Sequence, residues 1–255
     1  MKVRLLSCNF LCIIFLFFSL SAFAEVNLNY KIQYRSVPSA LNGLASLAYE
    51  NLLWGRPDKA MPFYGYYKVG VVAGGSPTLG AFLEVAPIAP LVLKYQKSMT
   101  YRFLKSSVFN CETVYCFGSV ERNDFSIQLA AGSGKLVAVS SYLWRDLRVP
   151  ESSNPVLAEQ ELFTAMSGTH SYNELGLTIG YVLDDASIFG VHYTAGFISQ
   201  GSRRSAAIYG IYHWKWNDFD LTAGAGRYET DQASVSGSGI LFVIGKKFGE
   251  TLSLF

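Results

Sequence analysis

The sequence is poor in the residues that bind metals or act as nucleophiles, and it carries no strong charge of one sign. Of its 255 residues, three are histidine and four are cysteine. It has no zinc signature, no phosphate-binding loop in a strand–turn–helix setting and no repeat. We therefore expect neither a metal nor a cofactor.

Long apolar runs are also missing beyond the first residues. After residue 24, no stretch approaches the about 18 apolar residues that a membrane-spanning helix needs, which excludes a helical membrane protein. The N-terminus itself has Lys2 and Arg4 before an apolar run over 10–20, and then an A-x-A site at 22–24. This pattern predicts a secretory signal peptide over 1–24 that is cleaved, leaving a single domain over 25–255.

Removal of the predicted signal has two consequences for the rest of the chain. The formal charge of +2 falls to zero, because Lys2 and Arg4 are lost, and no basic excess remains to suggest nucleic acid as a partner. Two cysteines remain, Cys111 and Cys116, in a turn-like stretch. Because an exported compartment permits oxidation, we expect them to form a local disulfide; the alternative is a metal pair, which lacks a nearby histidine.

What the chain has in abundance is alternation of apolar and polar residues. Leu28, Tyr30, Ile32 and Tyr34 alternate with Asn29, Lys31, Gln33 and Arg35. A period of two places each set on one face of a strand. The same pattern predicts twelve strands, each near the length that crosses a bilayer at a tilt. They are 27–36, 44–54, 63–74, 78–86, 90–103, 122–131, 135–146, 170–183, 187–198, 205–216, 219–228 and 238–248.

The predicted connections alternate between short and long. If the first strand runs outward, the inner connections are short, apart from 55–62, and the outer ones are long, apart from 74–77. The longest outer connection, 147–169, includes a stretch at 150–163 that we expect to hold a short helix. Short periplasmic turns and longer extracellular loops are typical of outer-membrane barrels. The sequence thus predicts an all-β, antiparallel transmembrane barrel of twelve strands.

The C-terminus carries a further signal. Ile240, Phe242, Ile244 and Phe248 form an alternating outward face, whereas Phe255 is out of phase with them. Either Phe248 ends the last membrane strand or a bulge near Gly249 restores the phase.

With the signal peptide and the alternation, terminal Phe255 makes the chain similar to Gram-negative outer-membrane proteins in general, although to no specific family. The resemblance implies contact with outer-membrane lipid and lipopolysaccharide. It also implies recognition of the last strand by the barrel-assembly machinery.

Two strands and one hairpin allow finer expectations. In 170–183 and in 187–198, apolar residues occupy alternate positions. Both apolar sets face lipid if the turn between the strands has an odd number of residues, such as 184–186. This register places Thr178 opposite His192. In 135–146 both faces are partly apolar, so the facing stays open between a bulge and an apolar lumen wall. Trp214 and Trp216 are expected in the periplasmic aromatic girdle, or else as core residues of a soluble fold.

The inward face of the predicted strands carries charges of both signs. A twelve-stranded barrel lies between the packed eight-stranded size and the open sixteen-stranded size, so these charges either fill the lumen or line a water path. Basic residues concentrate on the first five strands, where they predict a positively charged wall that favours small anions. The lumen candidates are Lys31, Arg35, Glu50, Lys68, Glu84, Lys94, Arg102, Glu174 and His192, with His213 and Lys215 near the inner mouth.

The function expected from these features is a small passive-diffusion pore, or porin, acting as a monomer, with the 147–169 loop as a constriction. A closed barrel that acts through its loops, as an adhesin, receptor or scaffold, is the alternative. A third reading is a lipid hydrolase, since His192 and Thr194 share the spacing of a base and nucleophile on one face. A secondary hydroxyl is a poor nucleophile, and we name no catalytic residue.

Overall fold

The structure, a computed structural model, describes residues 25–36, 39–56, 64–74, 77–102, 118–149, 156–157, 163–164, 168–184, 187–198, 203–230 and 236–248. The predicted signal peptide, the predicted disulfide between Cys111 and Cys116, and Phe255 lie outside these residues. These three points remain predictions.

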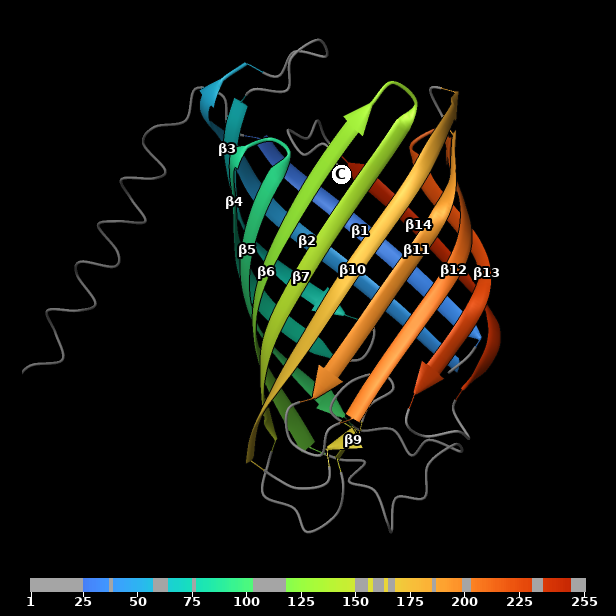
Figure 1. The fold of residues 1–255 in the computed structure, drawn as a ribbon. Coiled ribbons are helices and arrows are strands. Elements are labelled where there is room, and N and C mark those ends of the chain that lie inside the picture. Colours follow the sequence, from blue (N-terminus) through green and yellow to red (C-terminus); the bar gives the residue numbers. More distant parts are fainter. Residues whose placement is uncertain are drawn as a thin grey trace, which may run out of the picture.

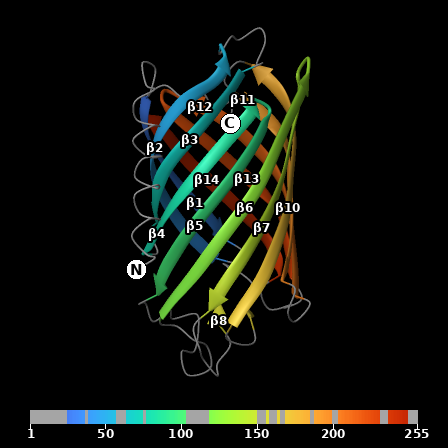
Figure 2. The same cartoon turned by 90° about the vertical axis from the view of Figure 1, so that its left-hand side faces the viewer.

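Twelve antiparallel strands form one closed barrel, as the alternation predicts. Each strand pairs with its neighbours along the chain, and β1 pairs with β14 to close the sheet (Figures 1 and 2). The strands are β1 (Glu25–Ser36), β2 (Ser39–Gly55), β3 (Tyr64–Gly74), β4 (Thr78–Ile88), β5 (Leu91–Arg102), β6 (Gly118–Ser133), β7 (Leu136–Val149), β10 (Gly168–Asp184), β11 (Ser187–Ile198), β12 (Arg203–Trp216), β13 (Phe219–Thr230) and β14 (Gly237–Phe248).

The outer surface of the barrel is an apolar belt. On β10, Leu175, Leu177, Ile179, Tyr181 and Leu183 are all exposed, as alternate residues that share one face of the strand. In water this surface would cost about 25 cal/mol for each Å² of apolar area, so the barrel requires a hydrocarbon environment. The structure thus confirms the predicted lipid face of this strand.

The two ends of the barrel differ in their connections. At the inner end, β4–β5, β6–β7, β10–β11 and β12–β13 are each joined by two residues, at 89–90, 134–135, 185–186 and 217–218. At the outer end, residues 103–117 separate β5 from β6, and residues 150–167 separate β7 from β10. The outer ends of these strands are at the lower end in Figure 1. The predicted asymmetry is confirmed, with the inner connection 56–63 and the outer connections 37–38 and 75–77 as exceptions.

The short helix expected in 150–163 is not found in the part of this loop that the structure describes. There β8 (Val156–Leu157) pairs with β9 (Phe163–Thr164) as a two-stranded antiparallel sheet. Both elements lie beyond the outer end of the barrel (Figures 1 and 2). Among the described residues, no helix is long and apolar enough to span a membrane.

The hairpin of β10 and β11 has the predicted register. Thr178 pairs directly with His192, and Leu177 with Tyr193 on the lipid side. The turn itself differs from the expected 184–186, because Asp184 pairs with Ser187 and a bulge interrupts the ladder between Val182 and Asp184. The extra bulge residue provides the odd count that the alternation requires.

The structure resolves the ambiguous facing of β7. Tyr142 and Trp144 are exposed on the lipid side, while Val137 and Val139 are partly buried inside the barrel. The ladders of β7 with β6 and with β10 run without interruption. The second apolar face is therefore an apolar part of the lumen wall, not the result of a bulge.

Aromatic side chains gather at the inner end of the barrel, as expected for an interfacial girdle. Trp216 is exposed and lies 6.3 Å, centroid to centroid, from Phe219 across the 217–218 turn. Trp214 points to the same outer side and stacks on Tyr212 at 5.5 Å. Elsewhere on the inner rim, between β2 and β4, the indole nitrogen of Trp54 donates to the carbonyl oxygen of Pro87 over 2.9 Å. The amphipathic indole suits this boundary between hydrocarbon and water.

Candidate functional site

Four charged side chains of alternating sign lie side by side on the inner wall. Glu50 pairs in register with Lys68, Lys68 with Glu84, and Glu84 with Lys94, across β2 to β5. Directly paired residues of an antiparallel ladder face the same side. We call Glu50, Lys68, Glu84 and Lys94 the charge ladder.

Lys68 is the central member of the charge ladder. Its ammonium lies 3.4 Å from Oε1 of Glu50 and 3.7 Å from Oε1 of Glu84. Glu50 is 2% exposed and also accepts a hydrogen bond of 2.8 Å from the amide of Asn27. The hydroxyl of Tyr66 donates to Glu84 over 3.2 Å. Buried carboxylates of this kind are tolerated only because each is paired and hydrogen-bonded.

The charge ladder changes the expectation of a positively charged wall. Lys68 and Lys94 are among the basic residues of the first five strands that predict such a wall. In the structure they alternate with two acids, Glu50 and Glu84, on the neighbouring strands. This part of the lumen is electrically balanced. Lys94 also lies over the ring of Phe82, at 4.5 Å from its centroid. Arg102 ends β5, and its side chain lies outside the described residues.

A second ion pair continues the polar wall onto β6 and β7. Arg145 and Asp124 are directly paired, and Nε and Nη2 of the arginine donate to the two carboxylate oxygens over 2.7 and 2.6 Å. Such bidentate pairs fix the guanidinium plane. Sequence reasoning missed Arg145 because the facing of β7 was open, and it did not single out Asp124 on β6. The pairing of β7 with β6 settles it.

The lumen contains a cavity of about 310 Å³ in its outer half. Its wall comes from both sides of the barrel, since Arg35 lies on β1 and Arg145 on β7. Tyr172 donates to Glu174 through its hydroxyl, and the guanidinium of Arg35 lies 5.4 Å from the ring centroid of Tyr228. We call this space the lumen cavity. Of the predicted lumen residues, the structure brings Arg35, Glu174 and His192 together here.

Lys31 differs in exposure from Lys68 and Lys94, the lysines of the charge ladder. It lies on the inward face of β1, between buried Asn27 and partly buried Gln33, and yet it is exposed. A side chain on that face is exposed only if the lumen beside it holds open space. The lumen is therefore not filled at this level.

The three histidines lie on the inward face of the barrel, as the alternation along their strands predicts. Nδ1 of His192 is 2.8 Å from the hydroxyl of Thr178, inside the barrel. His213, near the inner mouth, is hydrogen-bonded at 3.0 Å to Thr222, and its Nε2 lies 3.9 Å from Asp220. His170 is buried on the same face as Tyr172 and Glu174. Within the described ranges, no three acidic, histidine or cysteine side chains are close enough to hold a metal ion.

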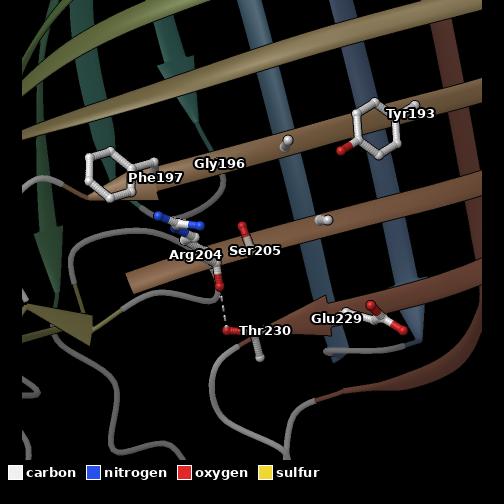
Figure 3. A pocket seen from close by; sticks show the side chains of 9 residues that line it. Tyr193, Gly196, Phe197, Arg204, Ser205, Glu229 and Thr230 are labelled. Carbon is white, nitrogen blue, oxygen red and sulfur yellow. Dashed lines mark hydrogen bonds between the residues drawn. The ribbon is translucent and has the colours of Figure 1, made fainter. Parts of the chain in front are cut away.

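The lipid-facing wall has one hollow at its outer end. A groove of about 650 Å³ runs over β11, β12 and β13, where Ala195 and Ala206 leave room between larger neighbours. Phe197 and Arg204 lie next to each other at one side of it (Figure 3), with the guanidinium 6.0 Å from the ring centroid. Glu229 also lines the groove, and its Oε1 lies 2.8 Å from Nε of Arg227. We call this feature the outer groove.

A closed antiparallel barrel with an apolar outer belt and a charged lumen is an outer-membrane β-barrel, and its place is the bacterial outer membrane. No family model matches the chain, and no curated protein matches it.

Solved structures of the same kind do match. An outer membrane channel from Pseudomonas putida F1 is 9% identical at a TM-score of 0.51, over 88% of this chain and 95% of that one. The beta domain of the Bordetella autotransporter BrkA is 12% identical at 0.43, over 89% and 98%. The NanC porin is 9% identical at 0.42, over 88% and 100%. The similarity to the Pseudomonas channel shows the fold alone.

Proposed function

We propose that the protein is a small passive-diffusion pore with a weak preference for anions. The observation that carries the proposal is the exposure of Lys31 on the inward face of β1, since it requires open space within the barrel. The lumen cavity adds further open volume in the outer half. Polar and charged walls around such space favour the passage of hydrated solutes.

The sign of the preference follows from the inward charges within the described strands. Seven basic side chains face five acidic ones, so a positive excess of two remains. The acids are all close to a basic or hydroxyl partner, whereas Lys31 projects into open space. An excess of this size focuses a modest positive potential in a narrow lumen. The basic side chains are Lys31, Arg35, Lys68, Lys94, Arg122, Arg145 and Lys215, and the acids are Glu50, Glu84, Asp124, Glu174 and Asp220.

The sequence also suggests two other functions. A closed barrel that acts through its loops needs a filled lumen, which the exposure of Lys31 disfavours. A lipid hydrolase needs a site that opens toward the bilayer, whereas His192 and Thr194 both line the lumen cavity. The hydroxyl nearest to His192 is that of Thr178, a secondary alcohol.

The test is single-channel conductance of the purified barrel in planar bilayers, with the reversal potential measured under a salt gradient. A steady current with a reversal potential on the anion side supports the proposal. A correctly folded barrel without current overturns it in favour of the closed barrel. Hydrolysis of phospholipid or lipid A that disappears in His192→Ala would instead establish the hydrolase.

We also propose lipopolysaccharide as the lipid partner of the outer groove. The groove lies at the end of the barrel that faces the outer leaflet, and its small residues leave a channel for an acyl chain. Arg204 at its edge supplies a cation for a lipid A phosphate. Arg227, two residues from Glu229, lies on the same outer face.

A further inference from the structure

The hydroxyl of Tyr209 is buried in the wall of the lumen cavity without a hydrogen-bond partner among the described residues. Tyr209 is 3% exposed, and its side chain borders the cavity from β12. A buried polar atom without a partner is destabilising, so such atoms are rare and call for an explanation. A ligand that enters the cavity and bonds to this hydroxyl supplies one.

The groups around Tyr209 offer donors and acceptors together. His192 is its direct neighbour on β11, paired with it in register. Arg35 supplies only donors, and Glu174, when ionised, supplies only acceptors. The hydroxyl of Tyr209 and the imidazole of His192 can do both. A ligand that satisfies this set must itself carry many groups that both donate and accept.

Aromatic rings form part of the same wall. Tyr172, Tyr209 and Tyr228 come from β10, β12 and β13 and all border the cavity. These rings are almost fully buried, and the guanidiniums of Arg35 and Arg145 lie over Tyr228 and Tyr172, so the rings add only a small apolar surface next to the polar groups. Sugars match this combination, because hydroxyls surround the edge of the ring while its C–H groups form an apolar face.

The charge of the cavity argues for a neutral ligand. Glu174 faces the same space as Arg35, and Arg145 is already held by both oxygens of Asp124. A strongly anionic ligand would meet the carboxylate of Glu174, and a cation would meet the two arginines. The volume of about 310 Å³ lies at the lower end of the range of ligand sites, about 300–1,000 Å³, which suits one or two sugar rings.

We propose that the lumen cavity is a binding site for a small neutral sugar, a mono- or disaccharide, with the Tyr209 hydroxyl as one of its hydrogen-bonding groups. This inference rests on the proposed pore function in that it names the class of solute that passes. Binding inside the path slows and selects that solute, whereas ions pass beside it.

The experiment measures binding and current separately. Isothermal titration calorimetry of the folded barrel in detergent uses maltose as the neutral probe and glucuronate as the acidic one, and bilayer recordings follow block of the ion current by maltose. Tyr209→Phe removes only the hydroxyl and is expected to raise the Kd for maltose about tenfold. The matched control is Tyr212→Phe, on the outward face of the same strand, which should leave the Kd unchanged.

The outcomes distinguish the two proposals. Binding of maltose that weakens in Tyr209→Phe and not in Tyr212→Phe supports the sugar site, even if the barrel carries no current and the pore proposal fails. An ion current without maltose binding leaves the pore standing and overturns the sugar site. Tighter binding of glucuronate than of maltose, or an unchanged Kd in Tyr209→Phe, also overturns it. The migration of the folded barrel on unheated gels shows that each variant has folded.

Discussion

Lys68 and Glu50 meet inside the barrel with their charged atoms 3.4 Å apart, whereas exposed Leu47, Val69 and Val71 lie on the lipid-facing side of the same strands. Glu84, on the other side of Lys68, completes a group in which one ammonium serves two carboxylates. The charge ladder therefore ties β2, β3 and β4 together from the inside. The contribution of the charge ladder to the stability of the barrel therefore depends on Lys68.

Replacement of Lys68 by alanine should destabilise the barrel strongly. It leaves the buried carboxylate of Glu50 with less compensation, and loss of one partner of a buried pair costs about 3–5 kcal/mol. The free energy of unfolding in urea, followed by tryptophan fluorescence in lipid vesicles, checks this. The matched control is Lys97→Ala, an exposed lysine on the outer surface of β5, with an expected change within about 0.5 kcal/mol. Equal effects of the two variants would contradict a stabilising ladder.

Reversal of the charge at Lys31 should change ion selectivity without changing the fold. Lys31→Glu replaces the exposed lumen cation by an anion, so the ratio of anion to cation permeability should fall below that of the wild-type pore. The reversal potential under a salt gradient measures this ratio. Lys97→Glu makes the same charge change on the outside of the barrel and should leave the ratio as it is. If both variants keep the wild-type potential, Lys31 does not lie in the ion path.

Replacement of Gly226 and of Gly210, on neighbouring strands, by alanine should have different effects on the stability of the barrel. A Cβ at Gly226 would collide with the backbone carbonyl oxygen of Ile208, whereas a Cβ at Gly210 would lie 3.8 Å from the carbonyl oxygen of Ala225. We expect Gly226→Ala to cost about 1–3 kcal/mol through strain, and Gly210→Ala to be neutral or slightly stabilising. Unfolding in urea compares the two variants. A barrel that tolerates both changes equally would contradict the close approach at Gly226.

Removal of the cation beside the outer groove should weaken the association with lipopolysaccharide. Arg204→Gln keeps the length and polarity of the side chain but loses its charge, and one basic residue near an anionic membrane surface contributes about 1 kcal/mol. The lipopolysaccharide that remains bound after purification, measured by native mass spectrometry, should fall roughly fivefold. Lys135→Gln, in the turn at the inner end, is the control and should bind as much as wild type. Equal losses would point to a nonspecific effect of charge.

The sequence alone predicted the features that depend on the order of neighbouring residues. Side-chain facing alternates along a strand whatever the strand pairs with, so the twelve strands and most of their lipid faces followed from periodicity. The compartment was predicted from this alternation together with the signal peptide and Phe255. The pairing of Thr178 with His192 was also predicted, because a hairpin with a short turn fixes its own register. Two apolar faces in β7 gave no such answer, since parity cannot distinguish lipid from an apolar part of the lumen.

Only the tertiary structure decided which residues meet in the lumen. Glu50 pairs with Lys68 across the 56–63 connection, and a bulge between Leu52 and Trp54 shifts that ladder, so neither parity nor loop length gives the partner. The wall of the lumen cavity includes Arg35 from β1, Arg145 from β7 and Tyr209 from β12, which are far apart in the sequence. Closure of the barrel by β1 and β14 brings these walls face to face. Contacts across a lumen depend on strand number, stagger and tilt together, which are properties of the closed sheet and not of any one strand.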